Sequence, residues 1–160
     1  MWGLPVRAVC EGRMTKYAGA EIVFQEVPDK VSLAIAITNC QGRCAGCHSL
    51  QLREDIGRDL EQDIEELLNK HYGVVNCVCF MGCGNDADSL MRCIAIAKMK
   101  GFETCLYVGD EQADVKLLPF LDYIKVGAYD DLSGGLNKET TNQRMYQLVD
   151  ITDKFRRKPC

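Results

Sequence analysis

The sequence predicts an α/β fold in which strands of a parallel sheet alternate with helices. The chain has 160 residues and 47% hydrophobic content, which suffices for one packed core. It is far shorter than the ~250 residues of a closed (β/α)8 barrel. Alternating β-branched runs are followed by runs whose apolar residues recur at helical spacing. No internal repeat or linker interrupts this pattern, so we expect a single domain with its core at about residues 20–155.

The first half of the chain is expected to form a hairpin and then a helix. Residues 20–27 and 31–37 are alternating β-branched runs, and Pro28-Asp29-Lys30 between them is a turn signal. Asp59, with a glutamine three residues later, resembles a capping box. The helix that it would begin has four aliphatic side chains on one face: Leu60, Ile64, Leu67 and Leu68.

The second half continues the alternation. Residues 74–81 are a continuous apolar run, typical of a strand buried on both faces. Residues 88–100 have helical periodicity and end at Gly101, a natural helix stop. The remaining expected elements are a strand at 104–108, a short helix at 111–118, a strand at 123–126 and an extended segment at 143–151.

This order implies right-handed crossovers, in an open doubly wound layer or in an incomplete barrel. In either architecture ligands gather at the carboxyl ends of the strands. Two loops rich in glycine or cysteine lie there, at residues 38–48 and 81–88. These loops are the places to look for a site.

Charge and hydropathy exclude several classes of partner. With 19 Lys and Arg against 23 Asp and Glu, the net charge of -4 argues against nucleic acid as the main ligand. No stretch approaches the ~20 apolar residues of a membrane span, and residues 1–10 lack the pattern of a secretory signal. We therefore expect a cytoplasmic protein, in which the 10 cysteines are packing residues, metal ligands or redox groups rather than disulfides.

Three of the cysteines form a compact motif. Cys40, Cys44 and Cys47 follow a predicted strand with the spacing C-x3-C-x2-C. Gly42 and Gly46 allow the backbone to wrap tightly, so the three thiolates can converge on one soft metal centre. Because a [4Fe–4S] cluster usually takes four cysteines, three would leave one iron free for a ligand that is not protein.

Other interpretations of these cysteines remain open. A structural zinc site would recruit His48 as its fourth ligand, although no second ligand pair has matching spacing. A thiol oxidoreductase would use Cys44 and Cys47 and would leave Cys40 without a role. The interpretation of these residues as ordinary core cysteines is disfavoured, because the loop that carries them contains glycine and arginine.

The cysteine motif resembles that of the radical S-adenosylmethionine superfamily. Three further segments are similar to the branch that activates anaerobic (class III) ribonucleoside-triphosphate reductase: Lys125-Val126-Gly127-Ala128-Tyr129, Gly134-Gly135-Leu136 and Thr140-Thr141-Asn142-Gln143-Arg144. The resemblance covers about residues 21–155. It implies an incomplete TIM-type barrel of parallel strands with helices outside.

The resemblance also implies the chemistry. Cys40, Cys44 and Cys47 would ligate three irons of a [4Fe–4S] cluster, and S-adenosylmethionine would chelate the fourth. One electron, from a donor such as flavodoxin or ferredoxin, would cleave the sulfonium to methionine and a 5′-deoxyadenosyl radical. That radical would abstract a hydrogen atom from a glycine of the reductase. Because the cofactors carry the chemistry, no catalytic acid or base is expected.

Six residues are expected to contact S-adenosylmethionine under this resemblance: Gly46, Cys47, His48, Gly82, Gly84 and Asp86. Glycines suit such contacts because a ligand can approach a backbone that has no Cβ. The alternative for the last three is a tight strand-to-helix turn in which Asp86 or Asp88 caps the helix. Residues 129–144 are expected to dock the reductase or to close over the cofactor.

Two alternative functions stay open. The chain would activate a different glycyl-radical enzyme, or it would be a zinc-stabilised interaction module without catalysis. Cys77 and Cys79 are two residues apart and share one strand face, with Cys83 just beyond. Buried free thiols are the common outcome of such a pattern, and a second metal centre is the alternative.

Overall fold

The computed structural model describes residues 14–39, 50–109, 115–127, 136, 139–141 and 143–147. Within them the elements follow in the order β1 (Lys16–Val23), β2 (Ser32–Ile37), η1 (Leu50–Arg53), β3 (Arg58–Asp59), α2 (Leu60–His71), β4 (Cys77–Met81), α3 (Ala87–Met99), β5 (Glu103–Tyr107), η2 (Leu118–Phe120), β6 (Tyr123–Val126) and β7 (Arg144–Gln147).

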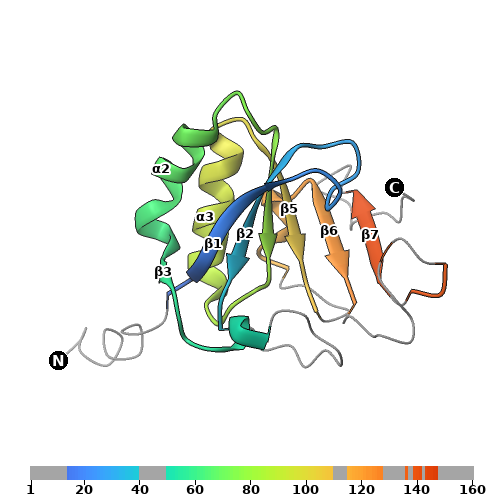
Figure 1. The fold of residues 1–160 in the computed structure, drawn as a ribbon, viewed down its shortest axis with the longest axis horizontal. Helices are drawn as coiled ribbons and strands as arrows, with labels where there is room; N and C mark the ends of the chain where they lie inside the picture. Colours follow the sequence, from blue (N-terminus) through green and yellow to red (C-terminus); the bar gives the residue numbers. More distant parts are fainter. Residues whose placement is uncertain are drawn as a thin grey trace.

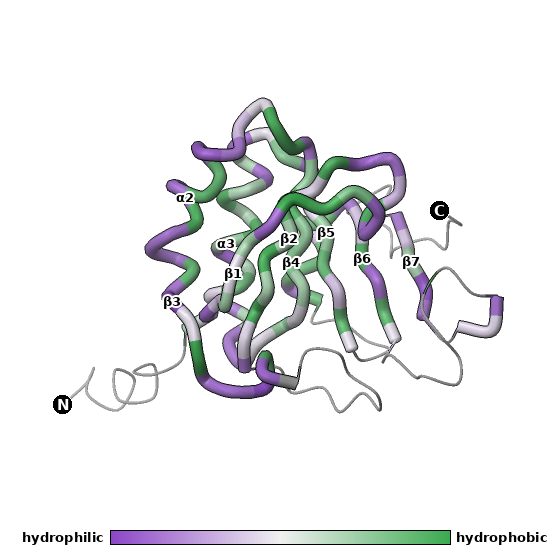
Figure 2. The backbone as a smooth tube through the Cα atoms, viewed as in Figure 1, coloured by the Kyte–Doolittle hydropathy of each residue, from purple (hydrophilic) through white to green (hydrophobic). Residues whose placement is uncertain are grey.

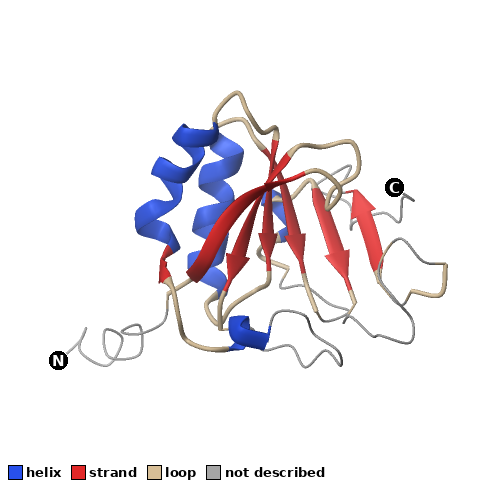
Figure 3. Ribbon diagram, in the orientation of Figure 1, coloured by secondary structure: helices blue, strands red, loops and turns tan. Residues whose placement is uncertain are grey.

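The strands form one mixed sheet in the order β3-β1-β2-β4-β5-β6-β7 (Figures 1 and 3). The four central strands, β2, β4, β5 and β6, pair in parallel. The strands at the two edges pair antiparallel, because β1 and β2 form a hairpin and β7 returns beside β6. The α/β class is confirmed, and the parallel pairing holds for the centre of the sheet.

Helices α2 and α3 cover one face of the sheet. Leu33, Ile35 and Ile37 of β2 belong to the same buried cluster as Ile64 of α2 and Ile94 of α3. Figure 2 shows the apolar colouring concentrated on the central strands, whereas the outer turns of α2 are hydrophilic. Burial of these side chains supplies the main driving force for the fold, at about 1.5–3 kcal/mol for each large one.

The opposite face of the sheet, which we call the helix-free face, carries no α-helix within the described residues. Strand register places its side chains in rows across the four parallel strands. The row at the carboxyl ends consists of Ala36, Met81, Tyr107 and Lys125. The row beneath it consists of Ala34, Cys79, Cys105 and Tyr123. This face therefore combines small, sulfur-containing and aromatic residues.

Most of the expected elements are present. The hairpin of β1 and β2 is confirmed, and Asp29 takes a left-handed φ of 64° in its turn. Helix α2 begins after Asp59, whose carboxylate accepts a hydrogen bond from Glu61 N at 2.9 Å. Helix α3 ends next to Gly101, which has a φ of 93°. The strand expected at residues 123–126 is β6.

Several boundaries differ from the expectations. The strand expected at 74–81 begins only at Cys77, because Val74 is exposed in the turn after α2. The first hairpin strand ends at Val23 rather than at residue 27. Of the helix expected at 111–118, residues 115–117 form a turn and only Leu118 is helical, as the first residue of the short η2 (Leu118–Phe120). Most of the loop at 129–144 lies outside the described residues. No helix among the described ranges is long and apolar enough to span a membrane.

The Ile94→Ala variant should show how strongly the fold depends on the helix-covered face. Ile94 is fully buried between α3 and the sheet, so its truncation should lower the free energy of unfolding by about 2–5 kcal/mol. Urea denaturation followed by circular dichroism measures this. Met99→Ala is the control, because Met99 ends the same helix and is 86% exposed. Equal losses in the two variants would contradict this packing.

Candidate functional site

The two loops expected to carry the site follow neighbouring parallel strands. The loop at 38–48 follows β2 and the loop at 81–88 follows β4, and these strands pair directly, with Ala36 opposite Met81. Both loops therefore begin at the end of the sheet formed by the carboxyl ends of the parallel strands (Figure 1). Five predicted site residues lie outside the described residues: Cys40, Cys44, Gly46, Cys47 and His48.

The chain on either side of the cysteine segment is joined by a set of hydrogen bonds that we call the loop clamp. The hydroxyl of the buried Thr38 donates to the carbonyl oxygen of Ile56 at 2.7 Å. Asn39 N donates to Glu54 O at 3.2 Å, and Asn39 Nδ2 donates to Asp55 Oδ1 at 3.0 Å. The clamp fixes residue 39, which directly precedes Cys40, against residues 54–56.

Strand β1 fastens the loop clamp to the sheet. Thr38 N donates to Lys16 O at 2.9 Å, and Lys16 Nζ lies 2.8 Å from Asp55 Oδ1. The hydrogen bond from Lys16 lowers the pKa of the Asp55 carboxyl. Gly57 closes the arrangement with a φ of 95°, and a Cβ there would lie 2.1 Å from the Tyr17 carbonyl oxygen. Only glycine fits at this crossing.

The glycine turn after β4 packs against the start of the cysteine loop. Gly82 and Gly84 have φ angles of 115° and 62°, and Gly82 N donates to Tyr107 O at 3.1 Å. A Cβ on Gly84 would lie 3.1 Å from Ile37 Cγ2 and 3.3 Å from Thr38 O. Backbone conformation alone therefore calls for glycine at both positions. Their contact with a cofactor stays a prediction.

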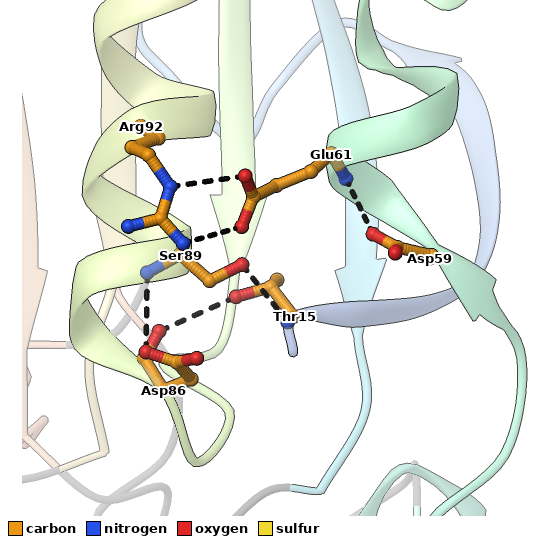
Figure 4. A network of polar contacts seen from close by, with 6 residues as sticks. All are labelled: Thr15, Asp59, Glu61, Asp86, Ser89 and Arg92. Atoms are coloured by element: carbon orange, nitrogen blue, oxygen red, sulfur yellow. Dashed lines mark hydrogen bonds and ion pairs between the residues drawn. The ribbon is translucent and has the colours of Figure 1, made fainter. Parts of the chain in front are cut away.

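Asp86 begins helix α3 (Figure 4). Its Oδ1 accepts a hydrogen bond from Ser89 N at 3.1 Å, which confirms the interpretation of Asp86 as an N-cap. Thr15, just before β1, holds the same turn: its N–H donates to Ser89 Oγ at 3.1 Å and its hydroxyl donates to Asp86 O at 3.3 Å. The turn that contains Gly82 and Gly84 is thus anchored by β1 on its helix side.

An ion pair joins the two helices beside this network. Arg92 of α3 donates from Nε and one terminal nitrogen to the carboxylate of Glu61 of α2, at 2.9 and 2.7 Å (Figure 4). These bonds lower the pKa of Glu61 and raise that of Arg92. A bidentate pair of this kind fixes direction as well as distance. It joins the first turn of α2 to the middle of α3.

The second group of cysteines is buried rather than arranged around a metal. Cys77, Cys79 and Cys105 are fully buried in one cluster on the helix-free face. Cys83 packs instead against the helix-side cluster. Burial raises the pKa of Cys77 to about 12, so this thiol keeps its proton at neutral pH. In the described part of the chain, no group of three or more His, Cys, Asp and Glu could hold a metal ion.

Described residues from two of the segments that resemble the reductase-activating branch, residues 125–129 and 140–144, are joined where β6 ends and β7 begins. Gln143 is buried, and its Nε2 donates to Gly127 O at 3.3 Å, which joins the end of β6 to the start of β7. Arg144 donates to Thr141 O at 2.6 Å. Lys125 Nζ lies 4.0 Å from the centre of the Tyr107 ring on the helix-free face. The carboxyl-end row therefore contains a cation, Lys125, which contacts its neighbour Tyr107.

A cavity of about 400 Å³ opens on the helix-free face beside the loop clamp. Its walls come from β1, β2, η1 and the end of β4: Ala18, Gly19, Ala20, Glu21, Ala34, Ala36, Gln51, Leu52 and Met81. The sequence reasoning did not identify it. The signal is the alternation in β2, where Ala34 and Ala36 are small and the intervening Leu33, Ile35 and Ile37 are large. Small residues on one face leave room there.

Comparisons with known proteins identify no relative. No protein-family model matches the chain, and no curated protein or solved structure matches it either.

Substitution of Asp86 should separate helix capping from other roles. Asp86→Ala removes the acceptor of Ser89 N and should lower the free energy of unfolding by about 1 kcal/mol. Asp86→Ser keeps a capping oxygen and should restore most of that loss, as thermal and urea denaturation would show. If the serine variant is as unstable as the alanine variant, the capping role is wrong.

Proposed function

We propose that the chain is a radical S-adenosylmethionine activase that generates a glycyl radical on anaerobic ribonucleoside-triphosphate reductase. The proposal rests on the spacing of Cys40, Cys44 and Cys47 and on the three segments that resemble this branch. Its fold would be an incomplete barrel, in which β2, β4, β5 and β6 supply the parallel strands and the helix-free face is the interior.

One observation carries the proposal beyond the motif. The loop clamp and the glycine turn bring Thr38, the second residue before Cys40, against Gly84. A ligand bound by the cysteine loop would therefore have the backbone of residues 82–84 close by. This proximity supports the proposal, because the exchangeable ligand of a cluster with one open iron needs contacts that the cysteines do not provide.

Different residues of the chain suit the iron–sulfur cluster and S-adenosylmethionine. Three cysteines within eight residues supply soft thiolate donors, which suit iron–sulfur clusters. The turn supplies backbone without Cβ atoms for a small polar ligand. When bound, the cluster and S-adenosylmethionine would supply a one-electron cleavage that yields a primary carbon radical. Gly46, His48 and Asp86 remain the proposed contacts around them.

The helix-free face suits an interior where a radical is formed. Its thiols at positions 77, 79 and 105 are fully buried beneath the carboxyl-end row. Met81 and Tyr107 of that row separate them from the edge where the loops meet. Burial keeps easily abstracted thiol hydrogens away from the edge at which the partner glycine must enter.

Anaerobic reconstitution with iron and sulfide tests the proposal. Reduction in the presence of S-adenosylmethionine should give methionine and 5′-deoxyadenosine in equal amounts, measured by chromatography and mass spectrometry. Adding the reductase should then produce the electron paramagnetic resonance doublet of a glycyl radical. Cys44→Ala should abolish cluster assembly, because two cysteines of the motif cannot hold the cluster.

Cys79→Ala is the matched control, since it removes a buried thiol of the sheet and should leave the iron content unchanged. A protein that holds zinc and no iron would support the interaction module instead. A cluster that never cleaves S-adenosylmethionine would likewise contradict the proposal. Radical formation on a different glycyl-radical enzyme only would redirect it to another partner.

A further inference from the structure

The outer edge of β1 is only partly paired. β1 pairs with β2 from Tyr17 to Val23, whereas β3 covers only Lys16 and Tyr17 on the other side. Among the residues that the structure describes, no strand pairs with residues 18–23 on this outer side. Free N–H and C=O groups along a sheet edge are a template for another strand. They specify an extended backbone as the occupant.

The side chains of this edge favour such contact. Proteins usually protect an open edge with charged side chains, above all lysine, with proline or with β-bulges. Residues 18–23 contain no lysine or proline, their one charged residue is Glu21, and the register irregularity lies at the start of the edge, between Tyr17 and Gly19. Instead, Ile22 is 38% exposed and Phe24, directly after the strand, is 68% exposed. Ile22 pairs with Leu33, so it lies on the helix-covered face of the sheet. An added strand would cover Ile22 with an apolar side chain.

The other face of the same edge opens into the cavity. Residues 18–21 form one wall of the cavity, which continues to Ala36 and Met81 at the carboxyl ends of β2 and β4. A Cβ built on Gly19 would have no atom within 4 Å, so the wall has free space there. A strand added to β1 would therefore lie at the rim of the cavity. The cavity continues from there to the carboxyl ends of β2 and β4, where the proposed site lies.

The charge of Glu21 indicates which kind of segment this edge would bind. Glu21 pairs with Ala34 and lines the cavity with it. Glu21 is exposed, and within the described ranges it forms no ion pair. A second copy of this chain would bring the same acidic edge, without a cation between residues 18 and 23. A segment with a basic residue opposite Glu21 is the complementary occupant.

We propose that this edge docks an extended segment of the glycyl-radical partner protein, which adds to β1 as a further strand. The segment carries a basic side chain toward Glu21 and an apolar side chain over Ile22. The identity of the partner rests on the proposed function, whereas the docking mode rests on the edge and the cavity. The end of the docked segment opposite residues 18 and 19 would lie level with Ala36, near the carboxyl end of β2, whereas its contacts with Glu21 and Ile22 would lie level with Ala34 and Leu33.

The test measures the Kd between the full-length chain and the full-length anaerobic ribonucleoside-triphosphate reductase of the same organism, by biolayer interferometry. Ile22→Lys and Glu21→Lys should each raise the Kd at least about tenfold, or about 1.4 kcal/mol. Val74→Lys and Glu65→Lys are matched controls at exposed positions away from β1, and they should bind as the unmodified chain does. Thermal unfolding verifies that all four variants fold.

Cleavage of S-adenosylmethionine without the reductase is measured on the same preparations, so failure of the proposed function is seen separately from failure of docking. It should be equal in the edge variants and their controls. Unchanged reductase binding by both edge variants would overturn the docking proposal, as would an unmodified chain that does not bind the reductase. Sedimentation that shows a dimer only when Ile22 is present would assign the edge to a second copy and would also overturn it.

Discussion

The parallel pairing of β2 with β4 is the constraint on which the rest of the structure depends. Because both strands end at one edge, the loop that carries the cysteine motif and the turn that carries Gly84 must start side by side. Gly84 packs so closely there, at a φ of 62°, that a Cβ would lie only 3.1 Å from Ile37 Cγ2 and 3.3 Å from Thr38 O. The loop clamp joins the same residue, Thr38, to Ile56.

The two faces of the sheet have different roles: one packs under the helices and the other has the cavity. Large aliphatic residues such as Ile35 pack under α2 and α3 and stabilise the chain. The alanines between them leave the opposite face open, so a cavity forms beside the loop clamp. Strand β1 contributes to both the stability and the proposed docking. It holds the loop clamp through Lys16, and it also presents an edge with free backbone groups. Stability and the proposed site thus share the same strands.

Local sequence signals predict the parts of the fold that depend on local physics. The caps at Asp59 and Asp86, the stop at Gly101 and the buried strand β4 follow from residue type and spacing. The antiparallel return of β7 and the loop clamp depend on partners distant in the sequence, such as Thr38 with Ile56. No periodicity reveals those. The cysteine spacing predicts a soft metal centre, whereas nothing in the spacing predicts the cavity or the open edge.

The proposed function requires that three cysteines hold a cluster whose remaining iron is open to S-adenosylmethionine. Mössbauer spectroscopy of protein reconstituted anaerobically with isotopically enriched iron tests this most directly. The account predicts that adding S-adenosylmethionine changes the isomer shift of one iron site of the cluster and leaves the others unchanged. A cluster in which no iron site responds, or a protein that binds no iron, would contradict it.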